Sequence, residues 1–299
     1  MSPQVAKEVE IRPARGKSFL PIALLAPTAL FALALTILPL CFSVVTSFQS
    51  FPLGHSPVFV GLENYRGLLH DANFRNSLGT TLLFTISATA AEFVLGLGLA
   101  LLLKEEFSFQ GIVRCSLIVP MAIAPIVVGI IWRLLYNADV GLFSFVAESL
   151  TGRSLSVLSS TTLALPALIL VDVWEWTPFM FLILLAGLQS LPQEPFEAAR
   201  VDGAGNWNIF LHLTLPMLKP VIAASLLIRA LDAFTVFDQV FVLTQGGPGT
   251  ATEVATLMVY KTAFRFSQFG YGAAMAISVL IFVMILSAAA ARAFRGNLT

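Results

Sequence analysis

The chain has few charged residues. Of its 299 residues, 11% are charged and 57% are hydrophobic. Soluble domains carry about 25% charged residues, so this deficit argues against a soluble protein. The 17 basic and 17 acidic residues also cancel to a net charge of zero, which leaves no bulk field to attract nucleic acid. The composition predicts an integral membrane protein that has no nucleic-acid partner.

Cysteine and histidine are equally scarce. Cys41 and Cys115 lie in or beside apolar runs, where inert thiols are more expected than a disulfide framework. His55, His70 and His212 are scattered, and neither a CxxC pair nor a His-rich spacing occurs. The sequence therefore predicts no metal site. An enzyme would also need a clustered nucleophile and base, and no such cluster stands out, so the chain is predicted not to be an enzyme.

A nucleotide-binding loop is absent as well. The phosphate-binding pattern GxxxxGK[ST] does not occur in the chain. Gly16-Lys17-Ser18 resembles its end, but Ile11 stands where the first glycine is required. This segment also precedes a hydrophobic run instead of following a strand. We therefore expect no cofactor in this chain, and any ATP must be bound by another polypeptide.

Six hydrophobic runs are each long enough to span a bilayer, which takes about 20 apolar residues. Backbone groups in lipid must be satisfied within the segment, so each run is predicted to be a helix. The first run is too long for the apolar region of a signal peptide. The runs are Leu20–Phe48, Ser77–Leu103, Ile112–Leu135, Thr162–Leu188, Met217–Leu243 and Tyr271–Phe294. The expected fold is an all-α membrane bundle of six helices.

Basic residues favour one orientation. Lys7, Arg12, Arg15 and Lys17 precede the first run, and such residues collect on the cytoplasmic side. With six spans, both termini are then cytoplasmic. The predicted organisation is a cytoplasmic tail over residues 1–19, one membrane domain over residues 20–295 and a short cytoplasmic tail over residues 296–299. This multi-pass chain is placed in the cytoplasmic membrane of a bacterium or archaeon.

A polar island separates the fourth and fifth runs and occupies residues 189–216. Pro192 and Pro195 fit the first turn of a helix, where a missing N–H costs nothing. Gly203 can end this helix in a left-handed conformation, and Asp202 can brace the turn or cap the next helix. A second short helix is expected from Asn206 to Leu213, after which Leu215-Pro216 should break the chain. The island is predicted to lie along the cytoplasmic membrane surface as two short helices joined by a turn.

The island also carries a recognisable spacing. Its sequence EAARVDGAGNWNIFLHLTLP, residues 197–216, has Glu-Ala-Ala, three residues, Gly, nine residues, an aliphatic residue, any residue and Leu-Pro. This resembles the coupling loop of ABC importer permeases, with leucine where the family usually has isoleucine. The alternative is an ordinary amphipathic loop. The resemblance assigns ATPase docking to Glu197, Ala198, Ala199, Asp202, Gly203, Ala204, Leu213, Leu215 and Pro216.

Further segments resemble the carbohydrate-uptake branch of this family, the six-helix permeases of the maltose and trehalose type. They are Gly61-Leu62-Glu63-Asn64-Tyr65, Asp172-Val173-Trp174 with Thr177-Pro178-Phe179-Met180, Phe237-Asp238 and Leu243-Thr244-Gln245-Gly246-Gly247-Pro248. The resemblance implies the bundle of a type I importer, in which substrate crosses by alternating access. It also implies two ATPase subunits that bind ATP and magnesium, an extracytoplasmic solute-binding protein and a second permease. It favours a different chain as that second permease.

Several charged residues lie inside the predicted spans, where charge is costly and faces a bundle interior or an aqueous cavity. Acids and amides that exchange hydrogen bonds with hydroxyls, together with aromatic rings, suit the path of a sugar or polyol. Helical spacing places Asp172, Glu175, Trp176 and Phe179 on one face. The predicted path residues are Asp172, Glu175, Trp176, Phe179, Arg229, Asp232, Thr235 and Gln239. The alternative is that the charges are structural pairs, Arg229 with Asp232 or with Glu92.

Two other functions remain open. Within importers, the substrate could be glycerol phosphate or another polyol instead of a sugar. Membrane carboxylates would equally suit a secondary transporter driven by an ion gradient, but the polar island would then have no role. The leading prediction is the permease subunit of an ATP-driven carbohydrate importer.

Overall fold

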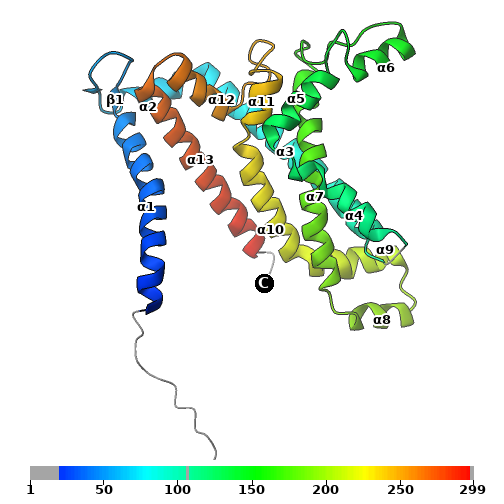
Figure 1. Ribbon diagram of the computed structural model, residues 1–299. Helices are drawn as coiled ribbons and strands as arrows, with labels where there is room; N and C mark the ends of the chain where they lie inside the picture. The colour runs from blue at the N-terminus through cyan, green and yellow to red at the C-terminus, as the bar shows by residue number, and fades with distance from the viewer. Residues whose placement is uncertain (1–19, 106–107, 297–299) are drawn as a thin grey trace, which may run out of the picture.

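The computed structural model describes residues 20–105 and 108–296, and most of them lie in helices (Figure 1). It contains five helical stretches that are long and apolar enough to cross a bilayer. Their main helices are α1 (Leu20–Ser47), α3 (Ala72–Leu102), α7 (Ala164–Gln189), α10 (Leu215–Phe234) and α13 (Phe269–Gly296). These helices confirm the all-helical membrane fold. The predicted tail at residues 1–19 lies outside the described residues, as do residues 297–299 of the tail predicted at 296–299, whereas Gly296 is the last residue of α13.

The third hydrophobic run is broken, so the prediction of one continuous helix over residues 112–135 is wrong. It forms α4 (Gln110–Ile118), the 3-10 turn η1 (Pro120–Ala122) and α5 (Pro125–Leu135). Proline has no backbone N–H to continue a helix. Ala124, before the second proline, has an extended ψ of 135°, as a residue preceding proline prefers. This run is therefore divided into two short helices.

The fifth run is also divided, near its far end. Helix α10 ends at Phe234, three residues follow without helical structure, and α11 (Asp238–Leu243) then begins. The hydroxyl of Thr256 donates to the carbonyl of Val236 at 2.5 Å, which satisfies one backbone group that the break sets free. Helix α5 packs against α11. The break places a turn of irregular backbone inside the bundle.

Short elements form the connections, and several lie where only loops were predicted. Strands β1 (Gln49–Ser50) and β2 (Val58–Phe59) pair antiparallel, with Gln49 opposite Phe59. The remaining elements are α2 (Glu63–His70), α6 (Leu142–Thr151), α8 (Glu194–Val201), α9 (Asn206–Ile209), the π-turn η2 (Phe210–Thr214), α12 (Ala255–Tyr260) and the π-turn η3 (Lys261–Arg265). In Figure 1, β1, α2, α6 and α12 lie at the upper end of the bundle, and α8 lies at the lower end.

The Gly61–Tyr65 segment fastens the upper end. Gly61 has a positive φ of 61°, and α2 starts two residues later. The amide of Asn64 donates to the carbonyls of Ser47 and Gln49 at 2.8 and 3.0 Å. The hydroxyls of Tyr65 and Ser47 lie 2.6 Å apart. These contacts bind α2 to the end of α1 and to β1.

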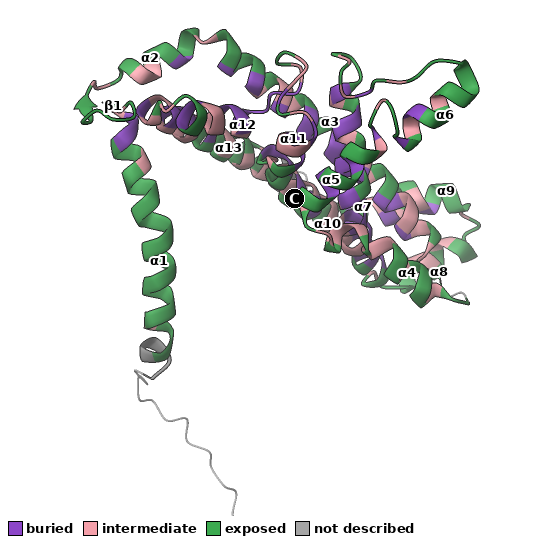
Figure 2. Cartoon of the chain, turned by 45° about the horizontal axis from the view of Figure 1, so that its top comes forward, coloured by how far each residue is buried: buried purple, intermediate pink, exposed green. Residues whose placement is uncertain are grey.

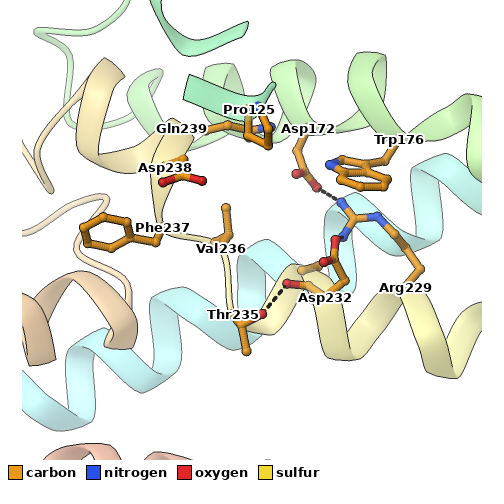
Figure 3. Close-up of a pocket in the computed structure, with 11 residues that line it drawn as sticks. Pro125, Asp172, Trp176, Arg229, Asp232, Thr235, Val236, Phe237, Asp238 and Gln239 are labelled. Carbon is orange, nitrogen blue, oxygen red and sulfur yellow. Dashed lines mark hydrogen bonds and ion pairs between the residues drawn. The ribbon is translucent and has the colours of Figure 1, made fainter. Parts of the chain in front are cut away.

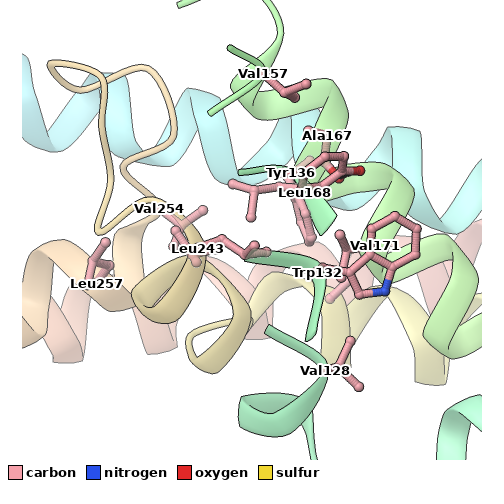
Figure 4. Close-up of a cluster of buried hydrophobic side chains, with 13 residues drawn as sticks. Val128, Trp132, Tyr136, Val157, Ala167, Leu168, Val171, Leu243, Val254 and Leu257 are labelled. Atoms are coloured by element: carbon pink, nitrogen blue, oxygen red, sulfur yellow. Dashed lines mark hydrogen bonds between the residues drawn. The ribbon is translucent and has the colours of Figure 1, made fainter. Parts of the chain in front are cut away.

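Burial is concentrated on α3, α7 and the elements beside them, whereas α1 is exposed over most of its length (Figure 2). One apolar cluster joins α5, α7, α11 and α12 (Figure 4). It includes Trp132, Leu168, Val171, Leu243 and Leu257. This cluster holds α5 and α11 in place beside α7, which positions the broken part of the fifth run.

Helices α3 and α7 pack closely at Gly96. A Cβ added there would lie 2.7 Å from Met180 Cβ and 2.9 Å from the backbone nitrogen of Phe181, whereas Gly98 has nothing within 4 Å. We expect Gly96→Ala to lower the free energy of unfolding by about 1–3 kcal/mol, as overpacking does. Gly98→Ala should raise it slightly, by roughly 0.5–1 kcal/mol, because alanine favours helix. Thermal unfolding in detergent checks both signs, and equal shifts would contradict the close packing.

Candidate functional site

The polar island forms α8, a turn and α9 at the lower end of the bundle (Figure 1). Pro195 lies in the first turn of α8, together with Glu194 and Glu197. Acidic side chains at this position interact favourably with the helix dipole. Arg200 lies in the last turn, where a basic side chain has the same effect. The first helix of the island is therefore formed by local signals, as predicted.

Gly203 supports the turn that follows α8. It has a φ of +79°, which glycine adopts readily and other residues rarely. Its N–H donates to the carbonyl of Arg200 at 3.0 Å, and the N–H of Ala204 donates to the carbonyl of Ala199 at 2.9 Å. The side chain of Asp202 does not cap α9, whose N-cap is Gly205 without a side-chain hydrogen bond. Gly203 thus has the left-handed conformation that the sequence predicted.

The second half of the island differs from the prediction. Helix α9 ends at Ile209 and passes through η2 directly into α10. Leu215 and Pro216 do not break the chain, because Pro216 lies in the first turn of α10, where its missing N–H is tolerated. Leu213 lies within the π-turn η2, which absorbs the change in helical register. A rigid helical connection therefore joins the island to the fifth run.

The island presents an exposed surface. Glu197, Ala198, Asp202 and Gly203 are all exposed. Two large apolar side chains beside them, Val201 and Trp207, are 87% and 69% exposed. Exposed apolar groups that are rimmed by polar residues are a feature of interaction surfaces.

A cavity of about 130 Å³ lies in the bundle where the fifth run is broken (Figure 3). It is bounded by α5, α7, α10, the irregular segment and α11. The lining residues are Pro125, Asp172, Trp176, Arg229, Asp232, Ala233, Thr235, Val236, Phe237, Asp238 and Gln239. Six of the eight predicted path residues are among them. The structure does not place Glu175 and Phe179 in the lining.

Arg229 is the centre of the charged residues in this region. Its side chain is 1% exposed and contacts carboxylates from three helices. Nε lies 2.7 Å from Glu92 Oε2 on α3, and one terminal nitrogen donates to Glu92 Oε1 at 2.9 Å. The same nitrogen donates to Asp172 on α7. The other donates to Asp232 on α10 at 2.9 Å.

This cluster contains both pairs that the sequence offered as structural alternatives, and it adds Asp172 as a third partner. The guanidinium also lies 5.1 Å from the centre of the Trp176 ring, a favourable cation–π distance. Three helices are therefore joined through one side chain. Asp232 is the exposed member, with 52% of its side chain accessible, so the cluster reaches from the helix core to the cavity wall.

Glu175 and Gln239 form a second buried pair. The amide nitrogen of Gln239 donates to Glu175 Oε2, and both side chains are nearly inaccessible. Glu175 therefore stands behind Gln239 instead of facing the cavity. Phe179 contacts Trp176 edge-to-face, with the ring centres 6.3 Å apart. Both residues support lining residues, so the prediction that they themselves line this cavity is not met in the structure.

Five lining residues were absent from the predicted path set: Pro125, Ala233, Val236, Phe237 and Asp238. Asp238 lies six positions after Asp232, and helical spacing does not place two such residues on the same face. Helical spacing does not apply across the break after Phe234, and Asp238 lies in the cavity wall beyond it. Pro125 belongs to α5, and no pattern within the chain indicated which helix would cover the cavity.

Comparison with known proteins places this architecture in a family. Residues 92–296 match the family described as "binding-protein-dependent transport system inner membrane component". The trehalose/maltose transport system permease protein MalF of Thermococcus litoralis is 41% identical over 77% of each chain. The trehalose transport system permease protein SugA of Mycobacterium tuberculosis is 36% identical over 87% of this chain and 82% of that protein.

The fold is likewise similar to solved transporters. A chain from a bacterial alginate ABC transporter, crystallised with an alginate pentasaccharide-bound periplasmic protein, superposes with a TM-score of 0.82 at 20% identity. The similarity covers 94% of this chain and 96% of that one. The family match covers more than half of the chain, and the five long apolar helices agree with its membrane location. The chain is therefore a multi-pass, non-enzymatic permease subunit of an ABC importer, a member of the binding-protein-dependent transport system inner membrane component family.

Proposed function

We propose that this chain carries a sugar across the cytoplasmic membrane by alternating access. The sugar is an oligosaccharide, a disaccharide or a sugar alcohol. The observation that carries the proposal is the cavity wall, in which the Trp176 ring lies beside the carboxylates of Asp172 and Asp232. Aromatic faces pack on the C–H surfaces of sugars, and carboxylates accept hydrogen bonds from their hydroxyls. The names of the trehalose and maltose relatives support the same substrate class.

The polar island is the proposed docking site for the ATPases. Its residues Glu197 to Ala204 are held by α8 and the Gly203 turn, and the helical connection through η2 leads directly into α10. Helix α10 carries Arg229 and Asp232. A movement of the island on ATPase binding would therefore be transmitted along α10 to the cavity wall. Two ATPase subunits would bind ATP and magnesium. Both termini of this chain would lie on the cytoplasmic side of the membrane, where the ATPases dock.

The other proposed partners follow from the family. An extracytoplasmic solute-binding protein would deliver substrate at the end of the bundle that carries α6 and α12. A second permease, of a different chain, would complete the path. A glycerol phosphate or other polyol permease is the runner-up within importers. An ion-driven transporter is disfavoured because it would give the polar island no role.

The test begins with a mild-detergent pull-down of this chain from its native membranes. We expect an ATPase with a GxxxxGK[ST] loop and a second permease to co-purify. After reconstitution in vesicles with the solute-binding protein, radiolabelled trehalose and maltose should accumulate only with ATP. Uptake that does not require ATP and is lost when the ion gradient is dissipated would overturn the proposal in favour of a secondary transporter.

A further inference from the structure

We propose that the cavity selects substrate by charge, admitting neutral or cationic polyhydroxyl compounds and excluding anionic ones, with Asp238 and Gln239 as specificity-determining residues. The inference rests on the proposed function, because it takes this cavity as part of the substrate path. It names the chemical class of substrate within that function. Three features of the wall carry it: exposed carboxylates, an arginine whose nitrogens are occupied, and a buried amide oxygen that lacks a donor.

The exposed charge of the wall is negative. Asp232 and Asp238 are both exposed, and they lie on either side of the irregular segment between α10 and α11. Figure 3 shows both at the cavity with Thr235 between them in the chain. Among the lining residues, all of which the structure describes, Arg229 is the one cation. These two carboxylates alone exceed that cation by one negative charge, and Asp172, a third carboxylate of the lining, is 2% exposed.

Arg229 does not provide a positive group that could bind an anionic ligand and compensate for this negative charge. All three of its nitrogens contact carboxylates of the chain itself, those of Glu92, Asp172 and Asp232. With 1% of its side chain exposed, it has no accessible fork for an incoming carboxylate or phosphate. Recognition of such groups normally uses arginine nitrogens in a bidentate arrangement. An anionic sugar would therefore meet the repulsion of the wall without the usual compensating contact.

The polar atoms nearest the break are acceptors. Gln239 gives its amide nitrogen to Glu175, and its Oε1 is buried without a hydrogen-bond partner among the described residues. The Thr235 hydroxyl donates to the backbone carbonyl of Asp232 at 2.9 Å, which leaves its lone pairs free to accept. A buried acceptor without a donor is energetically unfavourable. A substrate hydroxyl supplies that donor, whereas phosphate, sulfonate and carboxylate groups in their ionised forms do not.

The test measures the charge of the cavity directly, in the assembly purified from native membranes. Cys41 and Cys115 are first replaced by alanine, and Thr235→Cys then places one thiol between the two exposed carboxylates. Its reaction rate is measured with a cationic trimethylammonium-ethyl thiosulfonate and with an anionic sulfonatoethyl thiosulfonate. Ser56→Cys is the reference, because it lies exposed in the β1–β2 turn with no acidic or basic residue within four positions other than His55.

We expect the cation-to-anion rate ratio at position 235 to exceed that at position 56 by about tenfold or more, because one charge within several ångströms changes local reagent concentration by such a factor. Asp238→Asn should lower the ratio at least threefold, whereas Glu148→Gln, an exposed change on α6, should not. Equal ratios, a preference for the anionic reagent or a thiol that reacts with neither would overturn the proposal.

Failure here is separable from failure of the proposed function. The modification rates need no transport, whereas ATP-dependent uptake of trehalose or maltose needs no charge selectivity. A complex that accumulates neutral sugar and shows equal modification ratios would retain the function and refute the selectivity. A complex that shows the expected ratio and carries no sugar would retain the charged cavity and refute the sugar assignment.

Discussion

Gly203→Asp is expected to reduce ATP-dependent uptake by about tenfold or more while leaving the amount of folded protein in the membrane unchanged. Gly203 has a φ of +79°, and a Cβ added there would meet nothing within 4 Å. Aspartate is one of the few residues that tolerates this conformation, so the backbone should persist. The new carboxylate would project from the exposed surface that we propose docks on the ATPases. ATP hydrolysis should no longer be stimulated by the loaded solute-binding protein.

A matched control lies at the opposite end of the molecule. Gly152 ends α6 with a φ of +70° and also has nothing within 4 Å. Gly152→Asp therefore introduces the same residue into the same conformation, away from the polar island. Its uptake should stay within about twofold of the unmodified protein. Equal losses in both variants would trace the effect to backbone strain, and normal uptake in both would remove Gly203 from the docking surface.

Glu197→Lys probes the same surface by charge. Glu194 and Glu197 share the first turn of α8 and are both exposed. Either reversal loses about 0.3–1 kcal/mol of interaction with the helix dipole, so local stability should change similarly. The spacing pattern includes Glu197 and not Glu194. Glu197→Lys is therefore expected to uncouple hydrolysis from uptake, and Glu194→Lys serves as its control.

Arg229→Gln is expected to lower the free energy of unfolding by about 3–5 kcal/mol, the range for breaking a buried ion pair from one side. Glu92 and Asp172 are 0% and 2% exposed, so water cannot replace the lost guanidinium. Three helices would then hold carboxylates with no cation between them. Thermal unfolding of the purified protein in detergent measures the change, together with the yield of folded protein from membranes.

Two further variants separate charge from packing. The triple variant Arg229→Met, Glu92→Gln and Asp172→Asn removes cation and carboxylates together, so it should recover most of the stability that Arg229→Gln loses. Arg133→Gln is the control, since Arg133 is exposed and makes one hydrogen bond, to the carbonyl of Val242 at 3.2 Å. It should cost about 1 kcal/mol or less. If the triple variant were as unstable as Arg229→Gln, side-chain packing and not ion pairing would account for the stability that the cluster contributes.

Properties that depend on local composition were predictable. Long apolar runs indicated the five helical stretches that can cross a bilayer, because lipid requires that each backbone satisfies its own polar groups. Pro195 and Gly203 mark the start and end of α8 through their own backbone preferences. Arg229 with Asp232 was a candidate pair because three residues along a helix bring side chains together. The family followed from a spacing in the polar island.

Prolines showed the limit of such local rules. Pro120 and Pro125 break the third run, whereas Pro216 lies in the first turn of α10 and breaks nothing. Proline interrupts a helix interior but suits a first turn. Pro27, Pro39, Pro178 and Pro220 lie inside continuous helices, so a proline in an apolar run does not by itself fix where the run divides. The π-turn η2 extended the helical path upstream of Pro216, which the residue pattern alone did not reveal.

The amino-acid sequence by itself determined the membrane class, the position of the spans and the polar island, and the set of intramembrane charges. The tertiary structure decided which of those charges meet. Helical spacing assigns a residue to a face of its own helix, but it does not say which neighbour covers that face. In the structure, Arg229 has Asp172 as a further partner, and Glu175 is bound to Gln239 instead of facing the cavity. Asp238 lies in the cavity wall. These placements follow from packing between helices and from the break after Phe234, both of which depend on contacts between distant parts of the chain.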